Sequence, residues 1–517
     1  MLPILSTAQL RRLENIAMKR DDLTALHLME VAGTACAERI GQLVRSATFG
    51  PGDSVVVLAG MGNNGGDGLV VARRLHQAGI QVRVMRVVHR DGPSPENAEN
   101  HQRLLEIGLS IIDIDHSNYG IYVYDNVIII DSIFGSGLTR SPDGWVAHLI
   151  AMINASGCPV VSIDLPSGLI APDEGKPFDP AACIRADRTL TFEAPRLGLL
   201  LPETGEFAGR FELLPIGLDA GALVGKDRVG NWVGAMDIAE RLGPRPLFGH
   251  KGTFGHCLIA AGSRGMYGAA VLALKGCLRS GVGLVTGHSS GEMVTGMMTV
   301  APDAMCSIDP NADHMSVLPA LDRFNAVAIG PGCGQHPDTA AVVQQCLRSV
   351  QVPLVLDADA LNLLAQNPGW LDLLGPRTVL TPHPKEMDRL LGSPSTSSYE
   401  RLRRTQAFAQ RYGCTIVLKG AYSVTCTPDG ALYFNSSGNA GMAKGGSGDV
   451  LTGLLAGLLA QGYSVQNACL IGVYLHGSAG DISAQELGMD AMRPSDLIDA
   501  LPKGWKQLRS ASKKAVQ

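Results

Sequence analysis

Short apolar runs rich in β-branched residues alternate with helical patterns along almost the whole chain. Ser54–Leu58, Val127–Ile130 and Val160–Ile163 have the composition of buried strands. Gly68–Ala78 and Pro95–Ile107 have the composition and spacing of helices. Continuous hydrophobic strands that alternate with helices are typical of parallel sheets covered on both faces. The sequence therefore predicts an α/β fold with doubly wound sheets.

The alternation breaks once, at Gly217–Val229, a segment rich in Gly, Asp and Ala, and it restarts at Cys257–Ala261. A chain of 517 residues has room for two to four domains of ~100–200 residues. We predict one domain over residues 1–217 and a second over residues 227–507. From Lys503 on, the chain carries five basic and no acidic side chains, and we expect a solvated, fraying tail.

Composition excludes several classes of protein. Lys and Arg number 43 against 48 Asp and Glu, a net charge of −5, so the strongly basic balance of a nucleic-acid binder is absent. The longest apolar run, Val450–Ala460, is far shorter than the ~20 residues of a membrane span. The 11 cysteines are scattered and none forms C-x-x-C. We expect reduced thiols in a cytoplasmic protein that binds neither nucleic acid nor membrane.

A glycine-rich segment follows the first of these strands. Residues 60–68 read GMGNNGGDG, between the strand-like SVVVLA and the helix-like LVVARRL. Loop N–H groups and a helix N-terminus together attract an anion. The segment satisfies G-x-G-x-x-G, which also occurs in NAD-dependent oxidoreductases. The adjacent Asn63 and Asn64, however, favour an oxygen-seeking cation or a sugar. A loop that merely makes a tight turn is the structural alternative.

Two more strands end in a carboxylate. Asp131 closes VIIID and Asp164 closes VVSID, and small residues follow each of them. Ligands of open parallel sheets bind at the carboxyl ends of the strands. We therefore expect Asn64, Asp131 and Asp164 to lie around one site, although either aspartate could instead cap the next helix.

The motifs GMGNNGGDG, DSIFGSGL and DLPSG, in this order, resemble the N-terminal epimerase domain of NAD(P)H-hydrate repair enzymes over about residues 1–217. The resemblance implies a Rossmann-like domain in which Asn64, Asp131 and Ser167 hold K⁺. It makes Asp164 the acid/base candidate for interconverting R and S hydrates at the nicotinamide C6, because a carboxylate can exchange a proton with the C6 hydroxyl or its departing water. The implied contacts to the hydrated nucleotide are Asn63, Asn64, Gly65, Gly66, Asp67, Gly135, Ser136, Gly137, Leu138, Thr139, Arg140, Ser141 and Asp164.

A second glycine-rich segment, AGMAKGGSGDVLTG, spans residues 440–453. It lacks the Gly-Lys-Ser/Thr of a Walker loop. Gly445, Gly446 and Gly448 allow backbone N–H groups to surround a phosphate. Asp449, beside that anion site, could deprotonate a hydroxyl that attacks phosphorus. An aspartate that only caps the following helix is the alternative.

Further polar residues follow strand-like runs in this half of the chain. Lys419 in VLKGAY suits a phosphate contact, and Asp357 and Asp359 lie in VLDADALN. His383 lies between the two prolines of LTPHPKE, which restrict the backbone there. We expect these side chains to surround a nucleotide and its acceptor.

KGTFGHCLIAAGS, GPGCG, LTPHPKE, VLKGA and GGSGDVLTG resemble the ribokinase-like superfamily, and within it the ADP-dependent NAD(P)H-hydrate dehydratases, over about residues 227–507. The resemblance implies contacts of Ala269, Gly332, His383 and Asp449 with the hydrate, and Mg²⁺ bound with ADP. Tyr422 is bulkier than the residue expected there, which leaves the nucleotide contacts open. The implied nucleotide contacts are Lys419, Gly420, Ala421, Tyr422, Ser423 and Gly448.

The two resemblances thus imply that both domains act on the same hydrated nicotinamide nucleotide. The first domain is expected to epimerise NADH-hydrate and NADPH-hydrate, and the second to dehydrate the S hydrate with ADP, giving AMP and phosphate. We also expect a homo-oligomer. The main alternative is a ribokinase-like small-molecule kinase with a non-catalytic ligand-binding module in front. An ordinary NAD-dependent oxidoreductase ranks last, because no constellation for hydride transfer accompanies the glycines. The sequence leaves ADP against ATP open.

Overall fold

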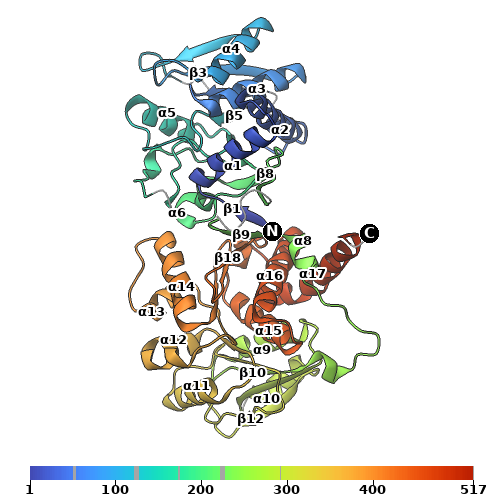
Figure 1. Ribbon diagram of the computed structural model, residues 1–517. Helices are drawn as coiled ribbons and strands as arrows, with labels where there is room; N and C mark the ends of the chain where they lie inside the picture. Colours follow the sequence, from blue (N-terminus) through green and yellow to red (C-terminus); the bar gives the residue numbers. More distant parts are fainter. Residues whose placement is uncertain (50–53, 121–126, 173–174, 222–227, 292, 516–517) are drawn as a thin grey trace. The chain divides into compact units, whose positions relative to one another are not determined.

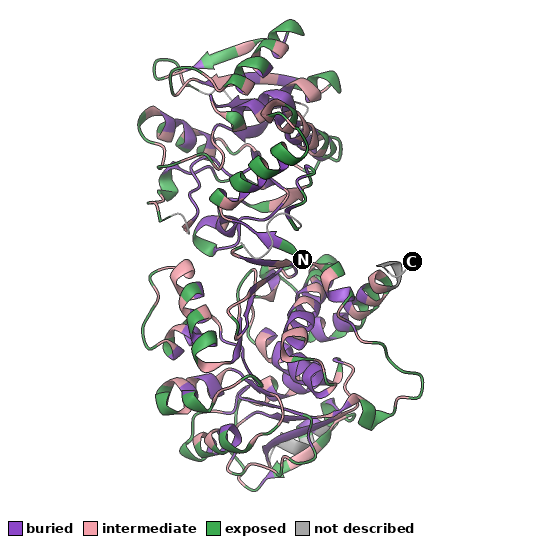
Figure 2. Ribbon diagram, in the orientation of Figure 1, coloured by how far each residue is buried: buried purple, intermediate pink, exposed green. Residues whose placement is uncertain are grey.

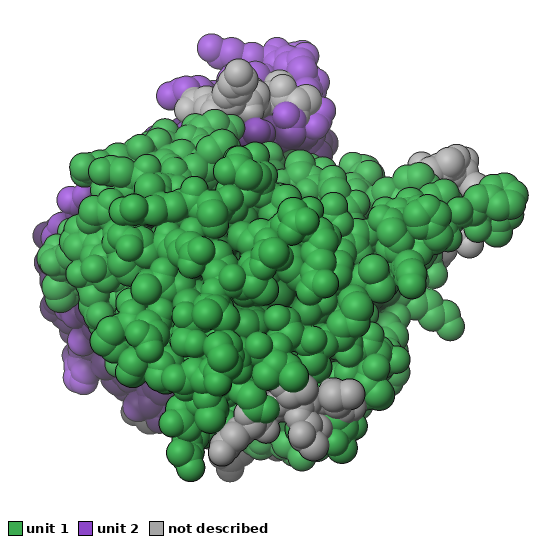
Figure 3. Space-filling model, turned by 90° about the horizontal axis from the view of Figure 1, so that it is seen from below, with its two compact units in different colours: residues 1, 230–517 green, residues 2–229 purple. Residues whose placement is uncertain are grey.

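The computed structural model describes residues 1–49, 54–120, 127–172, 175–221, 228–291 and 293–515. The chain forms two compact units, residues 2–229 and residues 230–517 with Met1 (Figure 3). Residues 222–227, within the boundary predicted from the sequence, lie outside the described residues. No helix in the described ranges is long and apolar enough to cross a bilayer. All 11 cysteines lie within these ranges and are unpaired.

The N-terminal unit is built around a parallel sheet with the strand order β4-β3-β2-β5-β6-β7-β8 (Figure 1). The order reverses between β2 and β5, as in doubly wound nucleotide-binding folds. The Rossmann-like prediction is therefore confirmed. In chain order the elements are β1 (Leu2–Ile4), α1 (Thr7–Arg20), α2 (Ala25–Arg45), β2 (Ser54–Ala59), α3 (Asn63–Gln77), β3 (Gln81–Val87), α4 (Pro95–Glu106), β4 (Ile111–Ile114), β5 (Val127–Ser132), α5 (Gly144–Ala155), β6 (Val160–Ile163), β7 (Arg188–Phe192), α6 (Pro202–Gly205) and β8 (Arg210–Leu214).

Strand β2 shows why both faces of this sheet are apolar. Val55 and Val57 pack into the core that α1, α2 and α3 form on one face. Val56 and Leu58 point to the other face and pack with residues of α5. Because successive side chains of a strand alternate between faces, a continuous apolar run requires cover on both sides. Residues 55–59 of β2 are accordingly all buried.

The first residues of two helices in this unit, α1 and α3, can be compared with the sequence predictions. Ser6 caps α1 and forms a capping box with Gln9, as the Ser-x-x-Gln spacing predicts. The glycine-rich segment 60–68, expected to be a loop, is mostly helix, because α3 already begins at Asn63. Gly65 sits so close to Gly60 that a Cβ would lie 1.9 Å from the Gly60 carbonyl oxygen. Gly60 and Gly65 thus allow the end of β2 and the start of α3 to pack closely against each other.

The C-terminal unit has the sheet order β9-β18-β17-β16-β15-β14-β13-β10-β11-β12. Strands β10 to β16 pair in parallel, β17 is antiparallel to both neighbours, and the order reverses between β10 and β13. The elements are β9 (Gly230–Val233), α8 (Ala235–Ala239), β10 (His256–Ala260), α9 (Tyr267–Leu278), β11 (Leu284–Ser290), α10 (Met293–Val300), β12 (Met305–Asp309), β13 (Ala326–Ile329), α11 (Pro337–Ser349), β14 (Leu354–Leu356), α12 (Asp359–Gln366), β15 (Thr378–Leu380), α13 (Pro384–Leu390), α14 (Ser398–Tyr412), β16 (Thr415–Leu418), β17 (Val424–Cys426), β18 (Leu432–Asn435), α15 (Ser447–Ala460), α16 (Val465–Leu487) and α17 (Pro494–Ala515).

Helix α15 lies in the core of this unit, and every residue from Val450 to Ala460 is buried (Figure 2). It packs closely on α9, where a Cβ at Gly453 would lie 1.8 Å from the Ala273 carbonyl oxygen. Only glycine permits this approach of two backbones. The packing holds the first turn of α15, and Asp449 with it, at a defined place.

The predicted fraying tail from Lys503 on is wrong for the described residues, because α17 continues to Ala515. Leu508 is buried, the Trp505 indole N–H donates to the Arg279 carbonyl at 3.0 Å, and Arg509 donates to the Gly243 carbonyl at 2.7 Å. Trp505 and Leu508 are three residues apart and so share one helix face. The basic residues between and after them obscured this apolar stripe.

Candidate active sites

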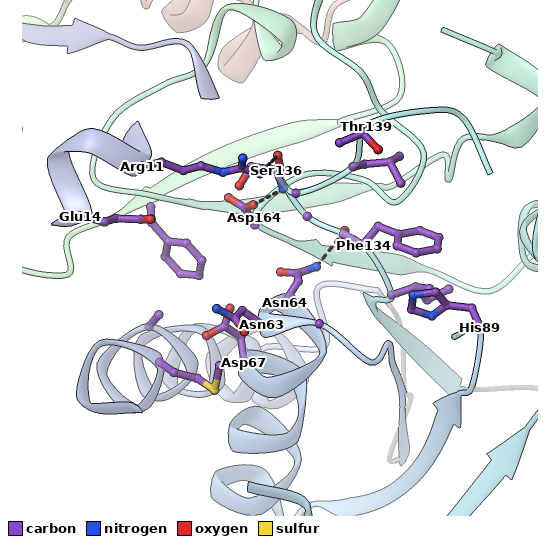
Figure 4. A pocket seen from close by; sticks show the side chains of 18 of the residues that line it. Arg11, Glu14, Asn63, Asn64, Asp67, His89, Phe134, Ser136, Thr139 and Asp164 are labelled. Atoms are coloured by element: carbon purple, nitrogen blue, oxygen red, sulfur yellow. Dashed lines mark hydrogen bonds between the residues drawn. The ribbon is translucent and has the colours of Figure 1, made fainter. Parts of the chain in front are cut away.

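The N-terminal unit holds a cleft of about 660 Å³ where the order of its strands reverses, beside the ends of β2 and β5 (Figure 4). Ligands of doubly wound sheets bind at such a reversal. Most of the residues that the sequence predicted for substrate contact line this cleft. They are Asn63, Asn64, Asp67, Gly135, Ser136, Gly137, Leu138, Thr139, Arg140, Ser141 and Asp164.

Gly65 and Gly66 do not line the cleft. Both are buried in α3, and a Cβ at Gly66 would lie 2.5 Å from the sulfur of Met29. Their place in the fold is explained by packing, and their contact with substrate stays a prediction.

The side chains of the predicted K⁺ ligands lie close together at one edge of the cleft. Asp131 and Ser167 are buried, and the Ser167 hydroxyl donates to the Asp131 carboxylate at 2.5 Å. The Phe134 carbonyl accepts from Asn64 Nδ2 at 2.9 Å and from Ser167 Oγ at 3.2 Å. Asn64 Oδ1 is buried and accepts no hydrogen bond from the described residues. Burial raises the pKa of Asp131 despite the donors around it.

Asp164 is held in a strained backbone position at the end of β6, with a φ of 68°. Its Oδ2 accepts the backbone N–H of Ser136 at 2.8 Å, and its Oδ1 forms an ion pair with Arg196. Arg196 is itself buried. A left-handed aspartate costs free energy that the surrounding structure must supply, and such residues cluster at active sites. The arrangement aims the carboxylate into the cleft (Figure 4).

Three further carboxyls line the cleft: Glu14 from α1, Asp67 from α3, and Asp143, which forms an ion pair with Arg140. Burial raises the pKa of Glu14, and the charge of Asp164 adds to that effect while Arg196 opposes it. Burial also raises the pKa of Asp67 well above its ordinary value, and Asp164 and Glu14 raise it further. The cleft thus combines an ion-paired carboxylate with two carboxyls that favour the protonated form.

In the C-terminal unit, buried Asp357 follows β14 and accepts from two side chains. Lys419 Nζ, at the end of β16, donates to Asp357 at 2.9 Å, and Thr452 Oγ1 of α15 donates at 2.7 Å. Glu386 of α13 lies 3.8 Å from Lys419 Nζ. Burial lowers the pKa of Lys419, but the two carboxylates outweigh it and raise that pKa overall. This lysine therefore stays charged, as a phosphate contact requires.

Asp449 stands in the first turn of α15 and does not cap the helix, because Gly446 occupies the N-cap position and no side chain bonds there. Burial, followed by the charge of Asp357, raises the pKa of Asp449 to about 7. Within the described chain, the backbone N–H groups of Gly446, Gly448 and Asp449 make no hydrogen bond. Such free N–H groups at a helix start attract an anion. A carboxyl that titrates near neutral pH thus lies beside an anion site.

The structure shows which residues lie beside the remaining predicted contacts. Gly332 and Ala269 lie together, since a Cβ at Gly332 would come within 3.0 Å of the Ala269 Cβ. Likewise, a Cβ at Gly448 would lie 3.2 Å from Lys419 Nζ. His383 caps α13 through Nδ1 and places Nε2 3.3 Å from Glu386.

The loop after β16 is arranged partly by contacts of its own. Ser423 bonds back to Gly420, and the ring of Tyr422 packs on Trp232 at 5.6 Å. The part of Ala421, Tyr422 and Ser423 in nucleotide binding stays a prediction.

Sequence reasoning missed several residues of both sites. Arg196 lies in a fourth strand-end segment, EAPRLG after β7, and the polar residue after a strand was the available signal. Glu14 and Arg11 come from α1, and Arg11 donates to the Ser136 carbonyl at 3.0 Å. No local pattern marks a helix that closes over a cleft. Glu386, which follows His383 in LTPHPKE, carries no local signal that would mark it as a neighbour of Lys419.

Each of the two units matches a known protein family. Residues 25–198 match the family model of the YjeF-related protein N-terminus, and residues 257–503 match that of NAD(P)H-hydrate dehydratase. The bifunctional NAD(P)H-hydrate repair enzyme Nnr of Moorella thermoacetica is 36% identical over 520 residues, covering 96% of each chain. That of Escherichia coli is 36% identical over 494 residues, covering 95% of this chain and 92% of its own.

Among solved structures, the ADP/ATP-dependent NAD(P)H-hydrate dehydratase of Bacillus subtilis, co-crystallized with ATP and Mg²⁺, is 31% identical with a TM-score of 0.48. The match covers 54% of this chain and 99% of that one. The full-length likeness rests on the curated relatives, which share more than 30% of their residues with this chain over nearly its whole length. The chain belongs to the family of bifunctional NAD(P)H-hydrate repair enzymes.

Proposed function

We propose that this chain repairs hydrated NADH and NADPH in two steps. The unit of residues 2–229 interconverts the R and S hydrates, and the unit of residues 230–517 dehydrates the S hydrate at the expense of ADP. The observation that carries the second step is Asp449, whose carboxyl titrates near pH 7 beside unpaired backbone N–H groups and the charged Lys419. That combination supplies a base for an alcohol and a cradle for phosphate.

In the dehydratase site, Asp449 takes the proton of the C6 hydroxyl, and the oxygen attacks the β-phosphorus of ADP. The bond from that phosphorus to the bridging oxygen breaks, and AMP leaves. The N–H groups of Gly446 and Gly448, with Lys419, stabilise the charge on the transferring phosphoryl oxygens. Phosphate then leaves C6 as the ring nitrogen donates its electron pair, and loss of a proton from C5 restores the dihydronicotinamide. Phosphorylation serves to replace hydroxide, a poor leaving group, by phosphate.

Mg²⁺ fits the carboxylates of this site. Asp449, Asp357 and Glu386 repel one another electrostatically, and hard divalent cations bind such oxygens together with nucleotide phosphates. Bound with ADP, Mg²⁺ would neutralise phosphate charge. ADP as the donor follows the family resemblance.

K⁺ fits the N-terminal cleft, because the donor set there is made of oxygens and one of them is unsatisfied. Asn64 Oδ1 is buried without a donor, next to the Phe134 carbonyl, Ser167 Oγ and Asp131. Carboxylate, carbonyl and hydroxyl oxygens suit hard cations. K⁺ held by Asn64, Asp131 and Ser167 would offset the buried charge of Asp131 and steady the loop from Phe134 to Ser141.

The test is turnover of an R/S hydrate mixture by the full chain, with ADP and ATP supplied in turn. We expect release of phosphate and recovery of the near-ultraviolet absorbance of reduced nicotinamide for both epimers. A small-molecule kinase would instead accumulate a phosphorylated acceptor, and a non-catalytic N-terminal unit would leave the R hydrate unused beyond its spontaneous conversion. The homo-oligomer and the cytoplasmic location expected from the sequence remain predictions, the first testable by light scattering.

A further inference from the structure

Two carboxyls of the N-terminal cleft have opposite surroundings. Asp164 accepts a backbone N–H and pairs with Arg196. Asp67 has no hydrogen-bond donor and no ion-pair partner for its side chain in the part of the chain that the structure describes. The charged groups that act on it are Asp164 and Glu14, both acidic. One carboxyl is thus neutralised by a cation, and the other can be neutral only by carrying a proton.

Helix geometry points Asp67 into the same cleft. Asp67 lies four residues after Asn63 in α3, and residues four apart share one face of a helix. Both line the cleft, and Figure 4 shows them together on α3, whereas Asp164 reaches in from the loop after β6. The two carboxyls therefore approach a bound ring from different elements.

Inversion at C6 needs two proton-transfer groups. The C6–O bond must break on one face of the ring and re-form on the other. Hydroxide is a poor leaving group, so an acid must protonate it, and a base must activate the incoming water. One ion-paired carboxylate cannot begin the reaction in both roles.

We propose that Asp67 is a second catalytic residue of the epimerase, the acid that protonates the departing C6 hydroxyl, while Asp164 is the base for the incoming water. This inference rests on the proposed function. Asp67 gives its proton to the hydroxyl, the C6–O bond breaks, and the ring nitrogen lone pair forms a C6–N1 double bond. Water on the opposite face loses a proton to Asp164 and bonds to C6, and the electron pair returns to nitrogen. A proton passes from Asp164 to Asp67 through solvent to complete the cycle.

Burial and the charges that act on Asp67 favour its protonated form. Glu14 approaches from α1, Asp164 from the β6 loop, and Cys36 from α2 is a buried thiol whose pKa is raised well above its ordinary value by that burial. No arginine is among the groups that shift the pKa of Asp67. A buried carboxyl that favours its proton, beside a carboxylate held by an arginine, is an arrangement suited to an acid and a base in one site.

The decisive experiment is Asp67→Asn in the full chain, assayed separately on R and S hydrate. Asparagine matches a protonated aspartate in shape and charge, so the fold should persist. We expect R-to-S conversion to fall by roughly 10²–10⁴-fold in kcat, with S-hydrate repair unchanged. Asp113→Asn is the matched control, since Asp113 pairs with Arg86 on β3 away from the cleft, and it should convert the R hydrate normally.

A D67N variant with normal kcat and a raised KM would overturn the inference, because Asp67 would then only bind substrate. Wild-type chain that fails to convert the R hydrate would instead refute the proposed function itself. A second measurement leaves Asp67 intact. Conversion by the wild type should decline at alkaline pH as Asp67 loses its proton, and Glu14→Gln, which removes a negative neighbour, should move that decline to lower pH. If the pH at which conversion declines is the same in E14Q as in the wild type, the inference is also overturned.

Discussion

Replacing Asp449 by asparagine should inactivate the dehydratase and stabilise the unit that contains it. The folded structure raises the pKa of Asp449 from 3.8 to about 7 through burial and the charge of Asp357. Below pH ~4 the carboxyl is protonated whether the chain is folded or unfolded, so it contributes nothing there. As the pH rises above ~4, the unfolded chain releases the proton first, and each pH unit costs the folded state about 1.4 kcal/mol until pH ~7.

The penalty therefore grows to about 4 kcal/mol at pH 8, and asparagine removes it. Urea unfolding of the full chain can follow this unit by fluorescence, since Trp232, Trp370 and Trp505 belong to it and only Trp145 to the other. The variant and the wild type should be equally stable at pH 4, and the variant more stable at pH 8. Asp322→Asn, at an exposed carboxyl, should show no such gain.

The same variant can also be tested by its S-hydrate turnover. Loss of a general base should lower S-hydrate turnover by roughly 10²–10⁴-fold, and turnover by the wild type should rise with pH through about 7 as Asp449 ionises. A D449N variant that is less stable than the wild type at pH 8, or that keeps full turnover, would refute the reasoning.

Four other changes have definite expected outcomes. Asp164→Ala should abolish R-to-S conversion while S-hydrate repair survives, measured by phosphate release from each epimer; conversion at the normal rate would reject Asp164 as base. Gly448→Ala places a Cβ 3.2 Å from Lys419 Nζ and should weaken ADP binding roughly tenfold, about 1.4 kcal/mol, by calorimetric titration. Lys419→Met leaves Asp357 buried without its cation and should destabilise its unit by about 3–5 kcal/mol, with recovery in the double variant with Asp357→Asn. Replacing K⁺ by Na⁺ should slow R-to-S conversion several-fold and leave S-hydrate repair unchanged; equal rates in both salts would argue against a K⁺ site at Asn64.

The sequence located those polar side chains that lie at or directly after the end of a strand, whereas their roles in the sites stay predictions. Asp131, Asp164 and Lys419 each follow an apolar run, and parallel strands bring their carboxyl ends to one edge of a sheet. The error at residues 60–68 came from composition, because glycines there looked like a loop although α3 starts at Asn63. The error at the C-terminus came from charge, because basic residues hid the apolar face of α17.

The sequence by itself determined the α/β class, the mostly parallel sheets and many of the residues that line the cleft, because strand and helix periods are local properties of the chain. Only the tertiary structure decided how those residues are charged. Arg196 pairs with Asp164 although the two lie 32 residues apart in the sequence, and Lys419 pairs with Asp357 at a separation of 62 residues. The protonation of Asp67 and Asp449 depends on burial and on charges brought from distant elements. Electrostatic free energy depends on distance in space and on the exclusion of water, and neither is written in the order of residues.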